Sequence, residues 1–376
     1  MDIAPYSLII AGDLVVEKSY NILDISEEIV DLFLQSNLNI LNLESPITDS
    51  VFKHLKTGPH IKGDKESTLQ ILEKLKINIV TLANNHILDY GSKGLNDTID
   101  FCSDNKIQYV GAGLNISEAG KTLYIDTDVG RIAIVNFCEN EWCIATEDSP
   151  GANPMDVISN VNQIIEAKVN SDIVIVIVHG GNEYFSYPSP RMQKQYRYYV
   201  DQGASLVVGH HTHCVSGSEI YKGVPIYYSL GNFLFTRKSE FTEWYIGGCL
   251  KVNIKNGLIA TEIIPVKQSK ETYQLDLLNN SELEKFKEKI DYINSIIYDK
   301  VKLQKMWDDF ILKVENSYLN YLSPLSFIGN RYIRAIIQKM NIKLFNKKGT
   351  AILLNMMRCE AHRDISKEVI KKYLLK

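Results

Sequence analysis

Short apolar segments rich in β-branched residues recur between residues 7 and 230, and most of them are continuous rather than alternating. They cover residues 7–12, 38–43, 77–83, 131–137, 172–178, 204–209 and 224–230. Continuous apolar strands are typical of sheets that are covered on both faces. Helical patterns separate many of these segments, at residues 26–36, 65–76, 94–105, 157–168 and 189–203. This alternation predicts a layered α/β fold.

The end of the chain has a different pattern. Residues 247–266 predict a β-hairpin that turns at Asn256-Gly257. From Ser281, which resembles an N-cap followed by Glu284, the pattern is helical. We therefore expect an α/β domain over residues 1–268 and an all-helical C-terminal region over residues 269–376.

The last part of this helical region is strongly basic. Residues 331–376 hold 12 Lys or Arg and three acidic residues. These helices can make a peripheral contact with an anionic membrane surface or with synthesis machinery. The alternative is that the charges form the solvated face of packed helices.

Composition excludes some partners and suggests a location. The chain of 376 residues has a net charge of −4, which gives no argument for nucleic-acid binding. No apolar run approaches the roughly 20 residues that span a bilayer. The N-terminus lacks the basic segment of a signal peptide. The scattered cysteines indicate free thiols in a reducing compartment, so we expect a cytoplasmic protein with no nucleic-acid partner.

Polar side chains that can bind a metal follow most of the apolar segments. They are Asp13, Glu44, Asn84, Asn85, His86, His179, His210, His211, His213 and Asn232. In open α/β sheets, the carboxyl ends of the strands border one crevice, where ligands bind. Carboxylates, amides and imidazoles at such a crevice are ligands for Zn²⁺, Mn²⁺ or Fe. Each residue alone has an ordinary explanation as a helix cap or a core histidine, but the ordered set predicts a metal site.

The same residues lie in motifs that together resemble one known family. The motifs are AGD (11–13), NLESPIT (42–48), TGPHIKG (57–63), LANNHILDYG (82–91), GAGLNISEA (111–119), VHGGNEY (178–184), VVGHHTHCVSG (207–217) and SLGNFLF (229–235). Residues 5–265 resemble the bacterial capsule-synthesis family called CapA, the poly-γ-glutamate synthesis type, a branch of the calcineurin-like metallophosphoesterases. The resemblance implies a four-layer β-sandwich flanked by helices, with a two-metal site at the strand ends.

Carried over position by position, the resemblance implies a role for each candidate. Asp13 and His213 bind the first metal ion, and Glu44 takes the bridging position. Asn85, His179 and His211 bind the second metal ion. His86, paired with Asn85, acts as the acid or stabilises the transition state, and His210 orients a ligand through its other ring nitrogen.

Two departures from the usual phosphoesterase pattern affect the first metal position. Residue 15 is Val where the Asp-x-His motif has histidine, and the bridging carboxylate is Glu44 rather than aspartate. Both changes reshape this position. We therefore expect two divalent ions (Mn, Zn or Fe), with one strongly bound ion as the alternative.

The leading functional hypothesis is metal-dependent hydrolysis of a phosphoester in the biosynthesis of a capsule, surface polysaccharide or poly-γ-glutamate-type polymer. Two metal ions can stabilise both the attacking and the leaving oxygen, and the chain has no GxSxG motif or catalytic-cysteine pattern. The expected substrate is a phosphorylated or anionic glycan or polymer precursor. The candidate substrate-binding residues are Lys62, Glu183, Tyr184, Arg191 and Asn232. The guanidinium of Arg191 matches phosphate, although it can equally pair with a neighbour.

Other functions remain open on the same residues. One is an accessory amide-bond or acyl-transfer role in polymer assembly, and another is a non-catalytic scaffold. A metal-dependent amidohydrolase barrel is a further alternative, but the His-x-His of that fold usually lies on the first strand, whereas here it is near residue 211. Residues 54–63 are expected to form a flexible, polar loop that gates the substrate.

Overall fold

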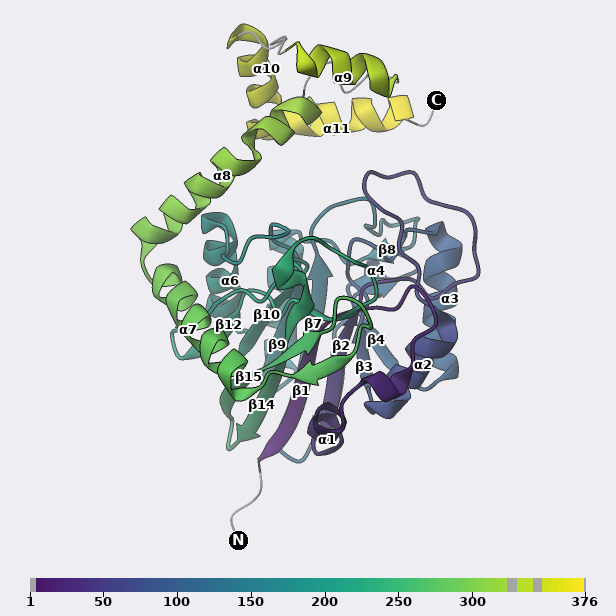
Figure 1. Cartoon of the computed structure of the whole chain (residues 1–376), viewed down its shortest axis with the longest axis vertical. Coiled ribbons are helices and arrows are strands. Elements are labelled where there is room, and N and C mark those ends of the chain that lie inside the picture. The colour runs from purple at the N-terminus through teal and green to yellow at the C-terminus, as the bar shows by residue number, and fades with distance from the viewer. Residues whose placement is uncertain (1–4, 323–329, 341–346, 375–376) are drawn as a thin grey trace. The chain divides into compact units, whose positions relative to one another are not determined.

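The computed structural model describes residues 5–322, 330–340 and 347–374 and is shown in Figure 1. It divides into two compact units, Met1–Trp307 and Asp308–Lys376. The first unit contains two large sheets, a short two-stranded sheet and the helices that cover them. Each unit is described by itself below.

The first large sheet has eight strands in the order β16-β15-β14-β1-β2-β3-β4, with β13 paired to β1. Its central strands, β1 to β4, are parallel, and β14 lies antiparallel to β1. The strands are β1 (Tyr6–Val15), β2 (Leu38–Leu43), β3 (Ile79–Thr81), β4 (Gln108–Val110), β13 (Asn232–Phe235), β14 (Ile246–Lys255), β15 (Leu258–Gln268) and β16 (Leu275–Leu277). Helices α1 (Glu27–Leu34), α2 (Lys65–Lys74) and α3 (Gly91–Asp104) share one buried apolar cluster with this sheet.

The second large sheet has six strands in the order β11-β12-β10-β9-β7-β6. They are β6 (Leu123–Thr127), β7 (Gly130–Cys138), β9 (Ile173–His179), β10 (Leu206–His210), β11 (Ser218–Tyr221) and β12 (Val224–Tyr227). Helices α5 (Val157–Val169), α6 (Pro190–Asp201) and α7 (Asn280–Ile297) share an apolar cluster with it. The remaining short elements are η1 (Ile22–Asp24), β5 (Ala112–Gly113), α4 (Ile116–Ala119), β8 (Gly151–Ala152) and η2 (Thr242–Tyr245).

The two large sheets pack against each other through a third apolar cluster. Ile10 and Ile40 of the first sheet belong to it together with Ile175 and Val208 of the second. Strand β9 shows why its sequence is apolar throughout: Ile173, Ile175 and Ile177 lie in this cluster, whereas Val174, Val176 and Val178 lie in the cluster shared with the helices. Figure 1 shows α2 and α3 on one side of the stacked sheets, with α6 and α7 on the other. The predicted four-layer α/β sandwich is therefore confirmed.

The hairpin between β14 and β15 is also confirmed. It turns at Asn256 and Gly257, whose φ angles are 53° and 75°. The predicted start of the next helix was wrong by two residues. The capping box joins Asn279 and Glu282 instead of Ser281 and Glu284, because the Asn279 side chain accepts from the Glu282 N–H and the Glu282 carboxylate accepts from the Asn279 N–H.

The compact first unit extends beyond the predicted domain boundary at residue 268. Strand β16 pairs with β15, and the apolar face of α7 lies in the cluster of the second sheet through Phe286, Ile290 and Ile293. Helix α8 (Lys300–Leu322) runs across the division between the units. Residues after 268 therefore complete the sandwich before the second unit begins.

The second unit is helical throughout its described residues, as predicted for the C-terminal region. After α8 it contains α9 (Arg331–Lys339), α10 (Lys347–Arg358) and α11 (Glu360–Leu374). Among its described side chains none is buried, and large apolar ones such as Ile336, Leu354 and Ile370 are exposed. Within the described ranges of the whole chain, no helix is long and apolar enough to cross a membrane.

Candidate metal centre

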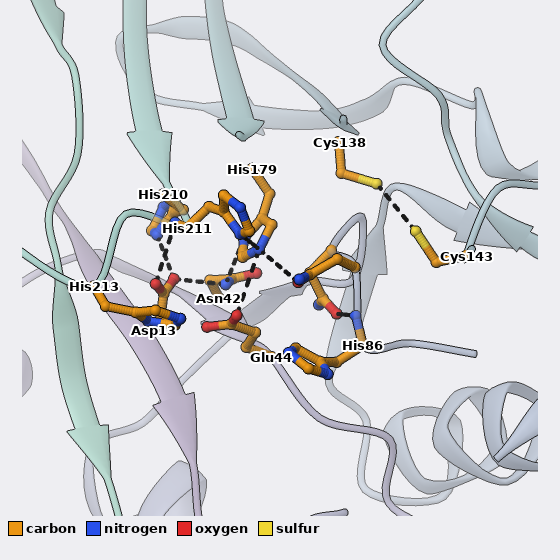
Figure 2. A network of polar contacts seen from close by, with 12 residues as sticks. Asp13, Asn42, Glu44, His86, Cys138, Cys143, His179, His210, His211 and His213 are labelled. Atoms are coloured by element: carbon orange, nitrogen blue, oxygen red, sulfur yellow. Dashed lines mark hydrogen bonds and ion pairs between the residues drawn. The ribbon is translucent and has the colours of Figure 1, made fainter. Parts of the chain in front are cut away.

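The predicted ligands gather where strands of both sheets end. Asp13 lies near the end of β1, Glu44 follows β2, and Asn85 and His86 follow β3. From the second sheet, His179 ends β9, and His211 and His213 follow β10. All these side chains are buried, and Figure 2 shows those of Asp13, Glu44, His179 and the 210–213 segment pointing toward one another.

The possible metal ligands form two groups that share one carboxylate. Atoms of Glu44, His179 and His211 lie within 4.8 Å of one another, and so do atoms of Asp13, Glu44 and His213. Glu44 therefore stands between two sets of ligand atoms. The bridging role that the resemblance implied for Glu44 stays a prediction.

The Glu44 carboxyl group is buried without a hydrogen bond from the described residues. It is 0% exposed, and neither of its oxygens has a hydrogen-bond partner among the residues that the structure describes. Its Oε1 lies 3.5 Å from Nε2 of His179. Burial, followed by the negative charge of Asp13, raises the pKa of Glu44 well above its usual range. Because an unpaired buried carboxylate is costly, this group fits a site that holds a cation.

The His179 side of Glu44 offers two imidazoles and an amide. Nε2 of His179 lies 3.1 Å from Nδ1 of His211 and 3.1 Å from Oδ1 of Asn85. Burial lowers the pKa of His179 well below its ordinary value, so the ring is neutral at pH 7. Neutral imidazole is the form that binds metal ions.

The Asp13 side is supported by more hydrogen bonds. Oδ1 of Asp13 accepts from Nδ2 of Asn42 at 2.7 Å and from Nδ1 of His210 at 2.9 Å, and Oδ2 accepts from the His211 N–H at 3.3 Å. Burial opposes ionisation of Asp13, but the hydrogen bond and charge of His210 outweigh it and lower the pKa. His210 therefore lies where a residue that orients a ligand would lie.

Asn232 holds His213 in place. Its Oδ1 lies 2.9 Å from Nδ1 of His213, and its Nδ2 donates to the Trp244 carbonyl at 3.0 Å. An Nδ1–H donor to Asn232 leaves Nε2 of His213 as the ring nitrogen with a lone pair. Sequence analysis predicted that Asn232 binds substrate, but the structure places it, buried, behind a candidate ligand.

The backbone of the GHHTH segment has an uncommon conformation. The φ angles of His211 and His213 are 88° and 57°. Non-glycine residues rarely adopt positive φ, and such strain occurs mainly where function requires a particular side-chain direction. Here it places the two histidines in different ligand groups.

His86 belongs to a buried polar group next to the ligands. Its Nδ1 lies 2.7 Å from Oδ2 of Asp89, and Nζ of Lys56 lies 3.2 Å from the same nitrogen. Lys56 also forms an ion pair with Oδ1 of Asp89. Burial lowers the pKa of His86 despite the nearby carboxylate. Asp89 thus orients the ring, and a proton on Nδ1 leaves the lone pair on Nε2.

The other predicted substrate-binding residues differ in position. Tyr184 is 44% exposed, and its ring centroid lies 6.1 Å from that of His213, so it borders the centre. Glu183, next to it in the chain, is exposed. Lys62 donates to the Ser50 carbonyl at 3.1 Å, and Arg191 forms an exposed ion pair with Glu139 at 2.8 Å. Lys62 and Arg191 therefore have protein partners rather than open positions in the site.

Sequence analysis assigned no role to Asn42, Lys56 or Asp89, although Lys56 lies in the predicted gating loop. Asn42 lies beside Asp13 in the pairing of β2 with β1, and its Nδ2 also lies 3.2 Å from Nδ1 of His179. Asn42 and Asp89 lie inside two of the family motifs, at residues 42–48 and 82–91. A polar residue within a buried, apolar segment could therefore have identified both. Lys56 carries no comparable signal, because its role depends on the path of a long loop.

Comparisons with known proteins agree with these motifs. Residues 7–237 match the family described as "Bacterial capsule synthesis protein PGA_cap". The chain is 33% identical over 245 residues to the "PGA biosynthesis protein CapA" of Bacillus subtilis, covering 62% of each chain. It is 34% identical over 259 residues to the "Capsule biosynthesis protein CapA" of Bacillus anthracis, covering 58% of this chain and 61% of that one. The match thus spans about three fifths of these relatives' length.

Further matches are more distant. A "Probable polyglutamine synthesis accessory protein" of Mycobacterium tuberculosis is 32% identical over 207 residues, covering 51% of this chain and 54% of that one. Among solved structures, a "novel phosphatase" from Mycoplasma pneumoniae has a TM-score of 0.46 at 16% identity, covering 72% of this chain and 96% of that one. A hypothetical protein from Thermus thermophilus has a TM-score of 0.45 at 16% identity, covering 69% of this chain and 99% of that one.

Proposed function

Because the chain belongs to the bacterial capsule synthesis family PGA_cap, we propose that it is a metal-dependent hydrolase acting on a phosphoester in the biosynthesis of a capsule polysaccharide or poly-γ-glutamate-type polymer. The observation that carries this proposal is Glu44. It is buried, it has no hydrogen-bond partner within the described part of the chain, and it belongs to both groups of candidate ligands. A shared carboxylate between two sets of imidazole and carboxylate ligands suits a pair of divalent ions.

Each ligand group has a place in this proposal. Asp13, Glu44 and His213 would hold one ion, and Glu44, His179, His211 and Asn85 would hold the other. Divalent Mn, Zn or Fe bound there would activate water and neutralise charge on the phosphoryl oxygens. A single strongly bound ion is the alternative, because Val15 supplies no ligand to the Asp13 side.

Side chains of the protein would then supply the proton for the leaving oxygen. Asp89 holds Nδ1 of His86, so His86 would donate a proton to the leaving oxygen from Nε2 only as the imidazolium, after Nε2 has taken up a proton from water. Because burial lowers the pKa of His86, the neutral ring would return after each transfer. Burial raises the pKa of Cys138 well above its usual range and also raises that of Cys214, next to His213. This suppresses the reactive thiolate at both of these described cysteines.

The test is metal analysis combined with an activity screen. Purified protein is loaded with Mn²⁺ or Zn²⁺, desalted, and analysed for metal, and we expect about two ions per chain. The loaded protein is then assayed on p-nitrophenyl phosphate and bis(p-nitrophenyl) phosphate. Activity should be lost in His179→Ala and retained in His362→Ala, a control histidine in the second unit. Equal activity in His179→Ala and the wild type would place catalysis elsewhere.

An accessory role in polymer assembly is the second candidate function of this centre. The printed name of the mycobacterial relative describes an accessory protein, which supports an accessory amide-bond or acyl-transfer role, or a non-catalytic scaffold, in polymer assembly. Metal binding without hydrolysis of either phosphoester would favour this alternative.

The proposed partner is a phosphorylated or anionic glycan or polymer precursor. In addition, the C-terminal helices would touch an anionic membrane or the synthesis machinery. The support is charge and exposure: residues 331–376 carry 12 basic and three acidic residues, and apolar side chains such as Ile333 and Ile336 are exposed. The cytoplasmic location stays a prediction.

A further inference from the structure

The segment between β2 and α2, residues 44–64, presents apolar side chains to solvent. We call it the β2–α2 loop, and Figure 1 shows it projecting beside α3. Val51, Phe52 and Leu55 are 88%, 68% and 63% exposed. The sequence predicted a polar, flexible gate over residues 54–63, and this stays a prediction. Val51, Phe52 and Leu55 give the loop an apolar tip, and specific contacts hold the residues around Leu55.

These contacts join the base of the loop to the candidate acid. The His54 N–H donates to the Asp89 carbonyl at 3.0 Å, and the Ile61 N–H donates to Oδ2 of Asp89 at 2.6 Å. Lys56 pairs with Asp89 and lies 3.2 Å from Nδ1 of His86. Leu55 therefore lies between two residues, His54 and Lys56, that contact the His86–Asp89 group, so the Leu55 end of the apolar tip is held beside the centre.

The loop also reaches the second sheet. Trp142, in the segment after β7, donates from Nε1 to Oγ1 of Thr57 at 3.2 Å and is 37% exposed. Its segment is anchored by the buried Cys138 and Cys143, whose sulfur atoms lie 3.7 Å apart (Figure 2). The β2–α2 loop thus connects the strand ends of both sheets, between which the ligands gather.

This surface suits an apolar ligand rather than a polyanionic one. Exposed apolar side chains gathered on one loop gain free energy when a ligand covers them. The cations predicted to bind substrate, Lys62 and Arg191, already have partners in Ser50 and Glu139. The exposed cation on the loop itself is Lys53, between Phe52 and Leu55. One lysine beside three exposed apolar side chains suits a ligand with a single anionic group and an apolar chain better than a polyanion.

We propose that the β2–α2 loop is an apolar subsite and that the substrate is the phosphoester of a long-chain alcohol, its hydrocarbon chain lying against Val51, Phe52 and Leu55. This inference rests on the proposed function, because it places the phosphoryl group at the metal centre. It adds a substrate class, namely a lipid-linked phosphoester.

The test compares two phosphonates that differ only in chain length. Isothermal titration of the Mn²⁺-loaded full chain with ethylphosphonate and with decylphosphonate, below its micelle concentration, measures binding without hydrolysis. We expect decylphosphonate to bind at least about tenfold more tightly, a gain of about 1.4 kcal/mol, less than two fully buried methylenes provide. The ratio should fall below about threefold in Phe52→Ser/Leu55→Ser, and in Leu55→Ser to a lesser extent.

Leu258→Ser is the matched control, because Leu258 is an exposed apolar residue beside the β14–β15 turn. This turn lies toward the beginning of β1, whereas the centre lies at its end. In Leu258→Ser, the ratio of the affinities for decylphosphonate and ethylphosphonate should equal that of the wild type. Metal content should be unchanged in all variants, which excludes loss of folding as the cause.

The outcomes separate the inference from the proposed function. Equal affinity for both phosphonates, or no binding of either, would overturn the apolar subsite. Vesicle binding that depends on Phe52 and Leu55, with equal phosphonate affinities, would also overturn it and show that the tip contacts a membrane. A tenfold preference that depends on the loop, without hydrolysis of decyl phosphate, would support the subsite and reject the hydrolase.

Discussion

The two sides of Glu44 differ in what they offer a metal ion. The His179 side brings together His179, His211 and the Asn85 amide, whereas the Asp13 side adds only Asp13 and His213. Val15 occupies the position where the usual phosphoesterase pattern has a histidine, and it lies in an apolar cluster with Ile61, Phe235 and Trp244. The number of ligands therefore favours the His179 side, and we expect it to bind its ion more tightly.

The Asp13 side compensates with fixed geometry. Asp13 accepts hydrogen bonds from Asn42, His210 and the His211 backbone, and His213 is held by Asn232. Such outer contacts orient ligands and affect metal affinity strongly. We therefore expect metal affinity to depend on the number of ligands at the His179 side and on the positioning of the ligands at the Asp13 side.

The largest expected effect belongs to Glu44→Gln, because Glu44 serves both sides. We expect metal content to fall from about two ions per chain to well below one, since the amide supplies no negative charge to either ion. Elemental analysis after loading and desalting measures this change. Glu262→Gln, an exposed position on β15, is the control and should keep the wild-type content. Retention of one full ion would show that Glu44 serves a single side.

Replacing one histidine on each side should distinguish the affinities of the two metal ions. His213→Ala should keep the tighter ion, whereas His211→Ala should keep only a weaker one that desalting removes. Titration of the metal-free proteins with Mn²⁺ gives both affinities. Equal residual affinity in the two variants would contradict the ranking of the two sides.

The orienting asparagines should have smaller effects. Asn42 contacts Oδ1 of Asp13 and Nδ1 of His179, so Asn42→Ala should weaken both ions. The Asn232 side chain contacts His213, and its backbone pairs with Asp13 between β13 and β1. Both residues belong to the Asp13 side, so Asn232→Ala, which keeps the backbone pairing, should weaken the Asp13-side ion alone. Each loss should be about 10- to 100-fold in affinity. The same Mn²⁺ titration distinguishes a loss on one side from a loss on both.

The sequence predicted the main features of the fold and the candidate ligands for a physical reason. Parallel strands that are covered on both faces must be apolar throughout, as β9 is, and their carboxyl ends meet at one edge. Asp13, Glu44, His179, His211 and His213 could therefore be placed together without knowing any contact. Their roles as ligands stay predictions.

The features that were missed depend on contacts between distant segments. The position of Asn42 beside Asp13 follows from the irregular register of β1 and β2. The role of Lys56 requires the path of the β2–α2 loop over Asp89. Strand β16 has only three residues and forms by pairing with β15, so its own sequence carries little signal.

The smallest expected effect concerns the two carboxylates in metal-free protein, because their pKa values shift in opposite directions. The pKa of Glu44 is raised by burial, so its contribution to stability is present at low pH and falls as the pH rises above the ordinary glutamate pKa. The pKa of Asp13 is lowered, so its contribution is present above the ordinary aspartate pKa and is lost as the pH falls.

Urea unfolding in EDTA between pH 5 and pH 8 should therefore show opposite changes in the two neutral variants. Glu44→Gln should become more stable than the wild type as the pH rises, whereas Asp13→Asn should be less stable than the wild type throughout. The stability difference between Glu44→Gln and the wild type should grow with pH, whereas the difference between Asp13→Asn and the wild type should stay nearly constant in this range. If both variants were more stable than the wild type, or both less stable, the two carboxylates would have similar environments. The contrast between the two sides of Glu44 would then rest on the number of ligands alone.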